Sequence, residues 1–138
     1  KAMGLVEEFY KVLLPRLPES EKYGLNSQIR RALVSIPANI AEGHGRYYYR
    51  EGVRFCLISR GSLEEVRTYI YLMSRLNYIS VDQLNEMLSK LNEIRRMLNG
   101  YIQYLQQQSE KESKKINEQP LDSMYFSTRD DANDSLVL

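Results

Sequence analysis

The residue types best suited to chemistry in this 138-residue chain are arginines and tyrosines near its middle. The run RYYYR covers residues 46–50 and is followed by Arg54 and Arg60, and residues 23–63 hold six arginines, no lysine and only two acids. An arginine side chain neutralises a phosphate, and a tyrosine ring offers a face on which a nucleobase can stack. One interpretation of the pattern is therefore nucleic-acid binding. The alternative is that the tyrosines pack between helices or subunits while the arginines are solvated.

The spacing of these arginines selects the residues of a predicted nucleic-acid surface. Arg46, Arg50 and Arg54 are four apart, so they line one edge of a helix that begins early in this run. Arg30 lies earlier in the chain, on a side of its predicted helix that faces away from the apolar residues. The predicted nucleic-acid-binding residues are Arg30, Arg46, Tyr48, Arg50, Arg54 and Arg60.

Catalysis and metal binding find little support in the same region. His44 is the only histidine, and the glycines on both sides of it would hold a general base loosely. A metal site needs three or four ligands, which one histidine and one cysteine, Cys56, do not supply. We therefore expect no enzyme activity, no metal and no cofactor, with His44 in a turn and Cys56 as a small, partly buried apolar residue.

The element that must position the arginines is a long helix predicted over residues 23–46. Either Asn26 or Ser27 can cap its first turn. Pro37 lies in its interior, where proline costs roughly 3 kcal/mol, so the helix is expected to need the bend. The apolar residues of one face predict a core stripe made of Leu25, Ile29, Ala32, Leu33, Ile36 and Ile40.

A polar ladder runs beside that stripe at helical spacing. It consists of Gln28, Arg31, Ser35, Asn39 and Glu42. Such a ladder can be a network that fixes the register of the bundle or of neighbouring subunits, or it can face a central surface that holds a ligand. We favour a network that includes the bend at Pro37, because the ladder abuts the core and mixes opposite charges.

Apolar periodicity predicts three more helices, over residues 2–14, 49–76 and 80–107. In the 49–76 helix, Ser59, Gly61 and Ser62 indicate the close approach of another helix, and Val53 and Leu57 indicate a second contact surface. Its predicted core line is Phe55, Ser59, Ser62, Val66, Ile70 and Met73, flanked by Tyr69 and Leu76. The last helix opens with a capping-box pattern and has a seam of Leu84, Met87, Leu91, Ile94, Leu98, Tyr101 and Leu105.

Four helices joined by short connections predict an all-α, antiparallel up-down four-helix bundle over residues 1–107. This part has 15 basic and 11 acidic residues, a net charge of +4. Residues 108–138 have 4 basic and 7 acidic residues, a net charge of −3, and we expect them to form a disordered polar tail with an apolar island at residues 124–126. Since no signal peptide or 18-residue apolar run is visible, we expect a cytoplasmic protein without a membrane partner.

The segment SQIRRALVSIPANIAEGHGR, residues 27–46, resembles the signature of a bacterial family of four-helix-bundle proteins. Its members include proteins encoded in intervening sequences of large-subunit ribosomal RNA genes, and the accessory protein of diversity-generating retroelements is similar more distantly. The resemblance covers about residues 2–105. It continues through FCLISRGSLEEVRTYIYLMSRLNYIS and MLNGYIQYL. It departs in the tail and in an aromatic-bearing segment that the family usually has before residue 1, so the first helix is expected to be truncated.

The resemblance implies a bundle that assembles into a ring, often a pentamer, and that associates with RNA or with a reverse transcriptase. We therefore expect a non-enzymatic, ring-forming accessory protein, a homopentamer that binds structured nucleic acid, RNA rather than DNA, through its arginine-rich surface. One alternative is an oligomeric protein scaffold that recruits a partner enzyme without touching nucleic acid. Another is a stand-alone bundle without a ligand.

Overall fold

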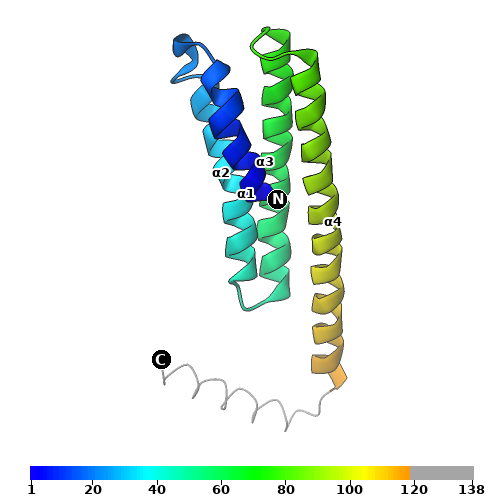
Figure 1. Cartoon of the computed structure of the whole chain (residues 1–138). Coiled ribbons are helices and arrows are strands. Elements are labelled where there is room, and N and C mark those ends of the chain that lie inside the picture. Colours follow the sequence, from blue (N-terminus) through cyan, green and yellow to red (C-terminus); the bar gives the residue numbers. More distant parts are fainter. Residues whose placement is uncertain (119–138) are drawn as a thin grey trace.

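The computed structural model of the protein describes residues 1–118, which form a bundle of four helices with no strand among them. In chain order these are α1 (Ala2–Glu8), α2 (Leu25–His44), α3 (Tyr49–Arg75) and α4 (Val81–Glu118). Consecutive helices run in opposite directions, and α1 covers only the upper part of the bundle (Figure 1). The predicted all-α, antiparallel four-helix fold is confirmed.

The first helix changes geometry along its length. The α-helical turns of α1 pass into a π-helical turn, Phe9–Leu13, and then into a 3₁₀ turn, Leu14–Arg16. Leu5, Phe9, Leu13 and Leu14 are buried in the core. Tyr10 is exposed, and the Arg30 guanidinium lies 4.7 Å from the centre of its ring.

The apolar stripe of α2 packs as predicted, but the helix begins differently. Five of the six predicted core residues are buried, and Ile40 is half-buried against them. The predicted caps are wrong, because Gly24 is the capping position and the Glu21 carboxylate accepts the bond from the Leu25 amide at 2.8 Å. A carboxylate one turn before the helix satisfies the same free N–H group that an Asn or Ser cap would.

The contact between α2 and α3 depends on small residues at two levels. In the middle, the Ser59 hydroxyl donates to the Ile36 carbonyl at 2.8 Å. Near the turn, a Cβ atom added to Gly43 would lie 2.9 Å from Phe55 Cβ and 3.1 Å from the Gly52 carbonyl oxygen, so the backbones meet there. Gly61 was predicted to lie at such a contact and is exposed, with nothing near its missing Cβ.

The core line of α3 differs from the predicted one at its edges. Cys56 and Leu63, which were not predicted as core residues, are fully buried, whereas Leu76 is exposed. Val53 was predicted on an outer surface and is half-buried against a small second core near the α2–α3 turn. The buried residues of that second core are Cys56, Leu98, Ile102 and Leu105.

The capping box of α4 is confirmed, because the Gln83 amide donates to the Ser80 hydroxyl and the Ser80 amide to the Gln83 side chain. The helix then runs to Glu118, so the expectation of a disordered tail is wrong for residues 108–118. No residue of 106–118 is buried, so packing ends at Leu105. The apolar island at residues 124–126 lies outside the described residues. None of the described helices is both long and apolar enough to span a membrane.

Candidate nucleic-acid interface

The turn between α2 and α3 presents two tyrosine rings to solvent. After α2 ends at His44, the Gly45 amide closes the last turn on the Ala41 carbonyl at 3.0 Å. Tyr48 has an extended backbone and directly precedes α3. The side chains of Tyr47 and Tyr48 are 82% and 65% exposed, and their ring centres lie 5.1 Å apart in an edge-to-face arrangement. Tyr49, the first residue of α3, is half-buried against the second core.

Arg46 is held in place by two contacts at this turn. Its guanidinium donates to the Glu42 carboxylate at 2.6 Å, and its central carbon lies 5.0 Å from the centre of the Phe55 ring. Both members of the ion pair are about half exposed, so the pair is worth at most about 1 kcal/mol. Arg46 can therefore exchange Glu42 for a phosphate at small cost.

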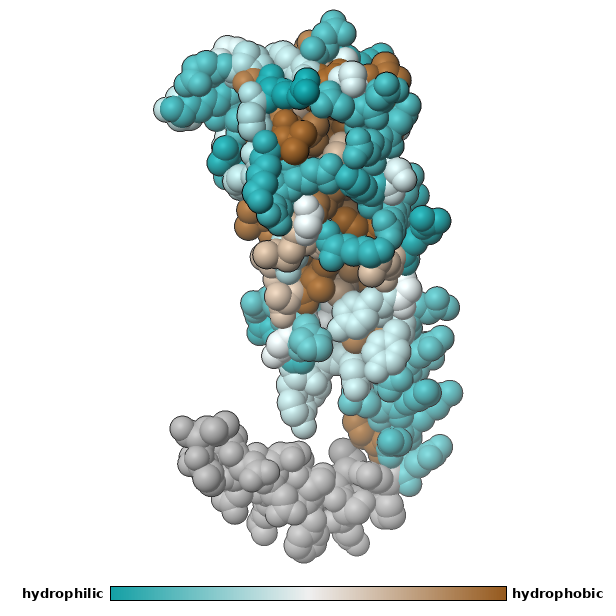
Figure 2. Space-filling view, in the orientation of Figure 1, coloured by the Kyte–Doolittle hydropathy of each residue, from teal (hydrophilic) through white to brown (hydrophobic). Residues whose placement is uncertain are grey.

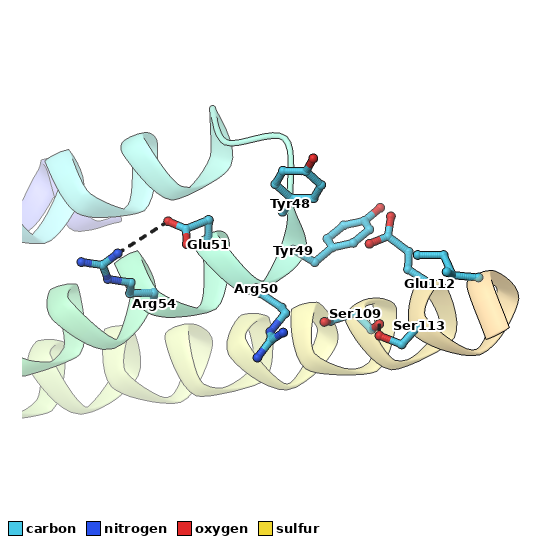
Figure 3. Close-up of a pocket in the computed structure, with 9 residues that line it drawn as sticks. Tyr48, Tyr49, Arg50, Glu51, Arg54, Ser109, Glu112 and Ser113 are labelled. Atoms are coloured by element: carbon cyan, nitrogen blue, oxygen red, sulfur yellow. Dashed lines mark hydrogen bonds and ion pairs between the residues drawn. The ribbon is translucent and has the colours of Figure 1, made fainter. Parts of the chain in front are cut away.

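Arg50 and Arg54 lie one turn apart at the start of α3. Arg54 is exposed and 3.9 Å from the Glu51 carboxylate, at the outer limit of an ion pair. Arg50 is exposed and forms no ion pair with any residue in 1–118. Both arginines line a groove of about 560 Å³ between the start of α3 and the end of α4 (Figure 3). Across the groove α4 contributes Ser109, Glu112, Ser113 and Ile116.

The six predicted nucleic-acid-binding residues do not form one patch. Three of them line one groove at the start of α3: Tyr48, Arg50 and Arg54. Arg46 lies in the preceding turn, outside the lining of that groove. Arg60 is half-buried farther along α3, where it donates to the Asn99 side chain at 3.0 Å and so joins α3 to α4.

Arg30 belongs to the opposite end of α2. It lies on the second turn of that helix, roughly 20 Å from the helix end at a rise of about 1.5 Å per residue. Its Nε donates to the Asn26 side chain at 2.7 Å, and its guanidinium covers Tyr10. Arg30 is exposed but is not part of the surface at the turn.

The polar ladder of α2 is only partly a network within one chain. Asn39 donates to the Ser35 carbonyl and to the Ser35 hydroxyl, both at 2.8 Å. The Ser35 hydroxyl pairs with that of Ser62 on α3 at 2.7 Å. The other three polar members of the ladder are exposed in the single chain: Gln28, Arg31 and Glu42. For these three, the expectation of a buried network within one chain is wrong. Their role between subunits stays a prediction. Pro37 lies between Ser35 and Asn39 and is half-buried.

Neither group considered for catalysis lines the groove between α3 and α4. The His44 Nδ1 atom is 3.4 Å from the Tyr101 hydroxyl oxygen, at the exposed end of α2. Cys56 is fully buried, and burial raises the pKa of its thiol above the usual value. The described residues contain no group of three or more His, Cys, Asp or Glu side chains that could hold a metal ion.

The α4 side of the groove was missed by sequence reasoning, which placed residues 108–118 in the tail. Ser109, Glu112, Ser113 and Ile116 are spaced three and four apart, and that spacing puts them on one face of a helix. This spacing was the available signal. It was weak because Ile116 is the only large apolar residue among residues 106–118.

These features define a class: a small helical bundle with a basic, tyrosine-rich turn at one end. The chain belongs to the 23S rRNA-intervening sequence protein family, whose model matches residues 1–100. It is also similar to a crystal structure of a protein of unknown function from the S23 ribosomal protein family of Bacteroides thetaiotaomicron. That similarity has a TM-score of 0.61 and 26% sequence identity, and it covers 73% of this chain and 90% of the other. No functionally curated protein matches significantly.

Proposed function

We propose that this protein is a non-enzymatic, oligomeric accessory protein that binds structured RNA through the surface at the α2–α3 turn. The observation that carries the proposal is the gathering of three exposed arginines with an exposed tyrosine: Arg46, Arg50, Arg54 and Tyr48. Arginine suits this task because its planar guanidinium group donates two hydrogen bonds at once to two phosphate oxygens. The family's description in terms of 23S rRNA intervening sequences supports RNA over DNA.

The affinity for RNA would come mainly from counterion release, because each arginine that meets a phosphate displaces condensed cations. A homopentameric ring would repeat the surface five times, so weak contacts would add across the assembly. We place this assembly in the cytoplasm, and a reverse transcriptase is a candidate partner of the RNA-bound form.

A charge-reversal variant tests the proposal. Replacing Arg50 and Arg54 with Glu should weaken binding of a structured RNA and reduce the slope of log affinity against log salt by roughly 0.7–0.9 for each lost phosphate contact. Neither side chain fills the core, so helicity and thermal stability should be unchanged. Fluorescence anisotropy across a salt series measures both quantities.

The matched control carries the same charge change at the opposite end of the bundle, as Arg16→Glu with Arg75→Glu. Both control residues are exposed and belong to the end where α3 finishes. The control should keep the salt slope of the parent. Equal affinity and equal slope for the Arg50→Glu, Arg54→Glu protein and its parent would reject the proposal.

A protein scaffold that recruits an enzyme without touching RNA is the second candidate. It is favoured by Leu57 and Ile58, adjacent apolar residues of α3 that are 41% and 44% exposed. Exposed apolar neighbours of this kind mark protein contact surfaces. The scaffold would retain its partner enzyme at high salt and show no salt-sensitive RNA retention, which separates it from the first candidate.

A further inference from the structure

The groove between α3 and α4 exists because α4 is longer than its neighbours. Figure 1 shows the end of α4 running past the α2–α3 turn, with no other helix beside it. Packing ends at Leu105, and short helical segments without packing are marginal in water. The groove-facing side of residues 109–116 therefore lacks a partner within the described chain.

The walls of this groove combine three kinds of group. Tyr48 and Tyr49 supply aromatic rings, Arg50 supplies a cation, and Glu112 supplies a carboxylate from the opposite wall. Figure 3 shows the Glu112 carboxylate pointing toward the Tyr49 side chain across the groove. The volume of about 560 Å³ lies in the range of roughly 300–1,000 Å³ that is typical of small-ligand sites.

We infer that this groove holds one unpaired nucleotide of the RNA, with its base against the tyrosines, its phosphate at Arg50 and an amino group of the base at Glu112. The inference rests on the proposed function and adds to it, because phosphate contacts alone carry no sequence information. Unpaired bases are the part of an RNA that proteins stack on aromatic side chains and read along their edges.

The carboxylate sets the preference among bases. An ionised carboxylate only accepts hydrogen bonds. Guanine, adenine and cytosine each carry an exocyclic amino group that donates. Uracil has none, and its single N3–H donor lies between two carbonyl oxygens that a carboxylate repels. The groove should therefore prefer an amino-bearing base to uracil. A neutral glutamine at position 112 would lose this preference, because its amide both donates and accepts.

The test uses one RNA hairpin in a blunt form and in forms with a short single-stranded end of cytidines or of uridines. The parent protein should bind the cytidine-tailed form several-fold more tightly than the blunt or uridine-tailed forms. Tyr49→Leu should remove most of this gain, because stacking of one base on an aromatic side chain accounts for an effect of this size. Glu112→Gln should make the two tails equivalent. Each comparison is made between hairpin forms within one variant, so a change in overall RNA affinity caused by the substitution cancels.

Two matched controls keep the result specific. Tyr23→Leu removes an 88% exposed tyrosine from the other end of the bundle, and Glu118→Gln removes a carboxylate beyond the groove. Neither should change the effect of the tail. Because Tyr49 also packs against the second core, the exposed Glu112 keeps the test informative if Tyr49→Leu is unstable.

The outcomes separate this inference from the proposed function. If the parent binds blunt and tailed hairpins equally and with a steep salt dependence, the inference fails while RNA binding stands. If it binds no RNA, both fail. If Glu112→Gln changes the mass of the assembly but not the base preference, the groove is a contact between subunits and the inference is overturned. Slower amide exchange in residues 109–118 with the cytidine-tailed RNA only would support it.

Discussion

Arg46 and Arg50 are only four residues apart in the sequence, yet the surroundings of their side chains differ. Arg46 is paired with Glu42 and lies over Phe55, so a phosphate must replace an existing partner. Arg50 has no ion-pair partner among the described residues, so a phosphate can interact with its whole positive charge. We therefore expect Arg50 to contribute more to RNA affinity than Arg46, although the sequence ranks them equally.

Cys56 was expected to be partly buried, and the structure buries it fully. Burial raises its thiol pKa, and only the thiolate reacts readily with alkylating reagents. Alkylation of the native protein at pH 8 should therefore be slower than in urea by about two orders of magnitude or more, since the core must open first. Mass spectrometry of quenched samples measures the rate.

The control for Cys56 is an exposed thiol on the same scaffold. Ser27→Cys in a Cys56→Ala background places one on the solvent side of α2. It should react at the rate of the unfolded chain under both conditions. A native Cys56 that reacts as quickly as this control would contradict the burial.

At the scale of elements, the crossing of α2 and α3 depends on Gly43. A methyl group there would meet Phe55 Cβ at 2.9 Å and the Gly52 carbonyl oxygen at 3.1 Å, and backbone cannot move aside as a flexible side chain can. Gly43→Ala should therefore lower the free energy of unfolding by about 1–3 kcal/mol, as overpacking does elsewhere. Urea denaturation followed by circular dichroism measures this change.

Gly100 gives the opposite expectation and serves as the control. It is exposed within α4, and no atom lies within 4 Å of its missing Cβ. Gly100→Ala should raise the free energy of unfolding by about 0.5–1 kcal/mol, because alanine loses less backbone freedom on folding than glycine. Equal effects of the two substitutions would show that the α2–α3 crossing is not tight.

The docking of α1 on α4 includes one ion pair whose pH dependence has a definite sign. The Lys90 Nζ atom lies 2.6 Å from both carboxylate oxygens of Glu8, and this hydrogen bond raises the pKa of Lys90 above 10.5. A raised lysine pKa stabilises the fold fully below the unfolded value and loses that effect as pH rises through the folded value. Glu8→Gln should cost at most about 1 kcal/mol at pH 8 because both side chains are partly exposed.

The difference between Glu8→Gln and its parent should then shrink above a pH of about 10.5, the ordinary lysine value. Denaturant midpoints at pH 8 and pH 11 give the comparison. Glu65→Gln, at an exposed carboxylate, should match the parent at both values. A Glu8→Gln effect that is the same at pH 8 and pH 11 would mean that Lys90 contributes by packing and not by charge.

Sequence reasoning predicted the features that repeat along a helix and missed the contacts between different elements. Apolar spacing identified four helices and most of the core, because burial repeats with the helical turn. It did not find the cap from Glu21 or the Gly43–Gly52 contact, since each joins residues from different elements. The groove was missed for a different reason. The α4 residues that line it are mostly polar, and a polar helical segment has a composition similar to that of a disordered tail.

At the scale of the whole molecule, the exposed side of α3 changes character along its length. It is basic at the start, with Arg50 and Arg54, and becomes apolar at Leu57 and Ile58. A second apolar surface lies in the groove between α4 and the α1–α2 pair, where Figure 2 shows hydrophobic residues among hydrophilic ones. RNA-binding and subunit-binding surfaces would then be neighbours on one helix, so assembly would bring the arginines of adjacent subunits close together.

This arrangement leads to a prediction about mass in solution. Light scattering at micromolar concentration should give several times the 16.2 kDa of one chain, about fivefold for the pentamer. Replacing Leu57 and Ile58 with Lys should reduce the mass toward one chain without unfolding the bundle, because both side chains are more than 40% exposed. The control, Val81→Lys, alters a 66% exposed apolar residue at the other end and should keep the parent mass.

A parent protein that is monomeric under these conditions would remove the basis for a ring. An oligomer that survives both lysines would move the subunit contact to another surface, the first candidate being the groove between α4 and the α1–α2 pair.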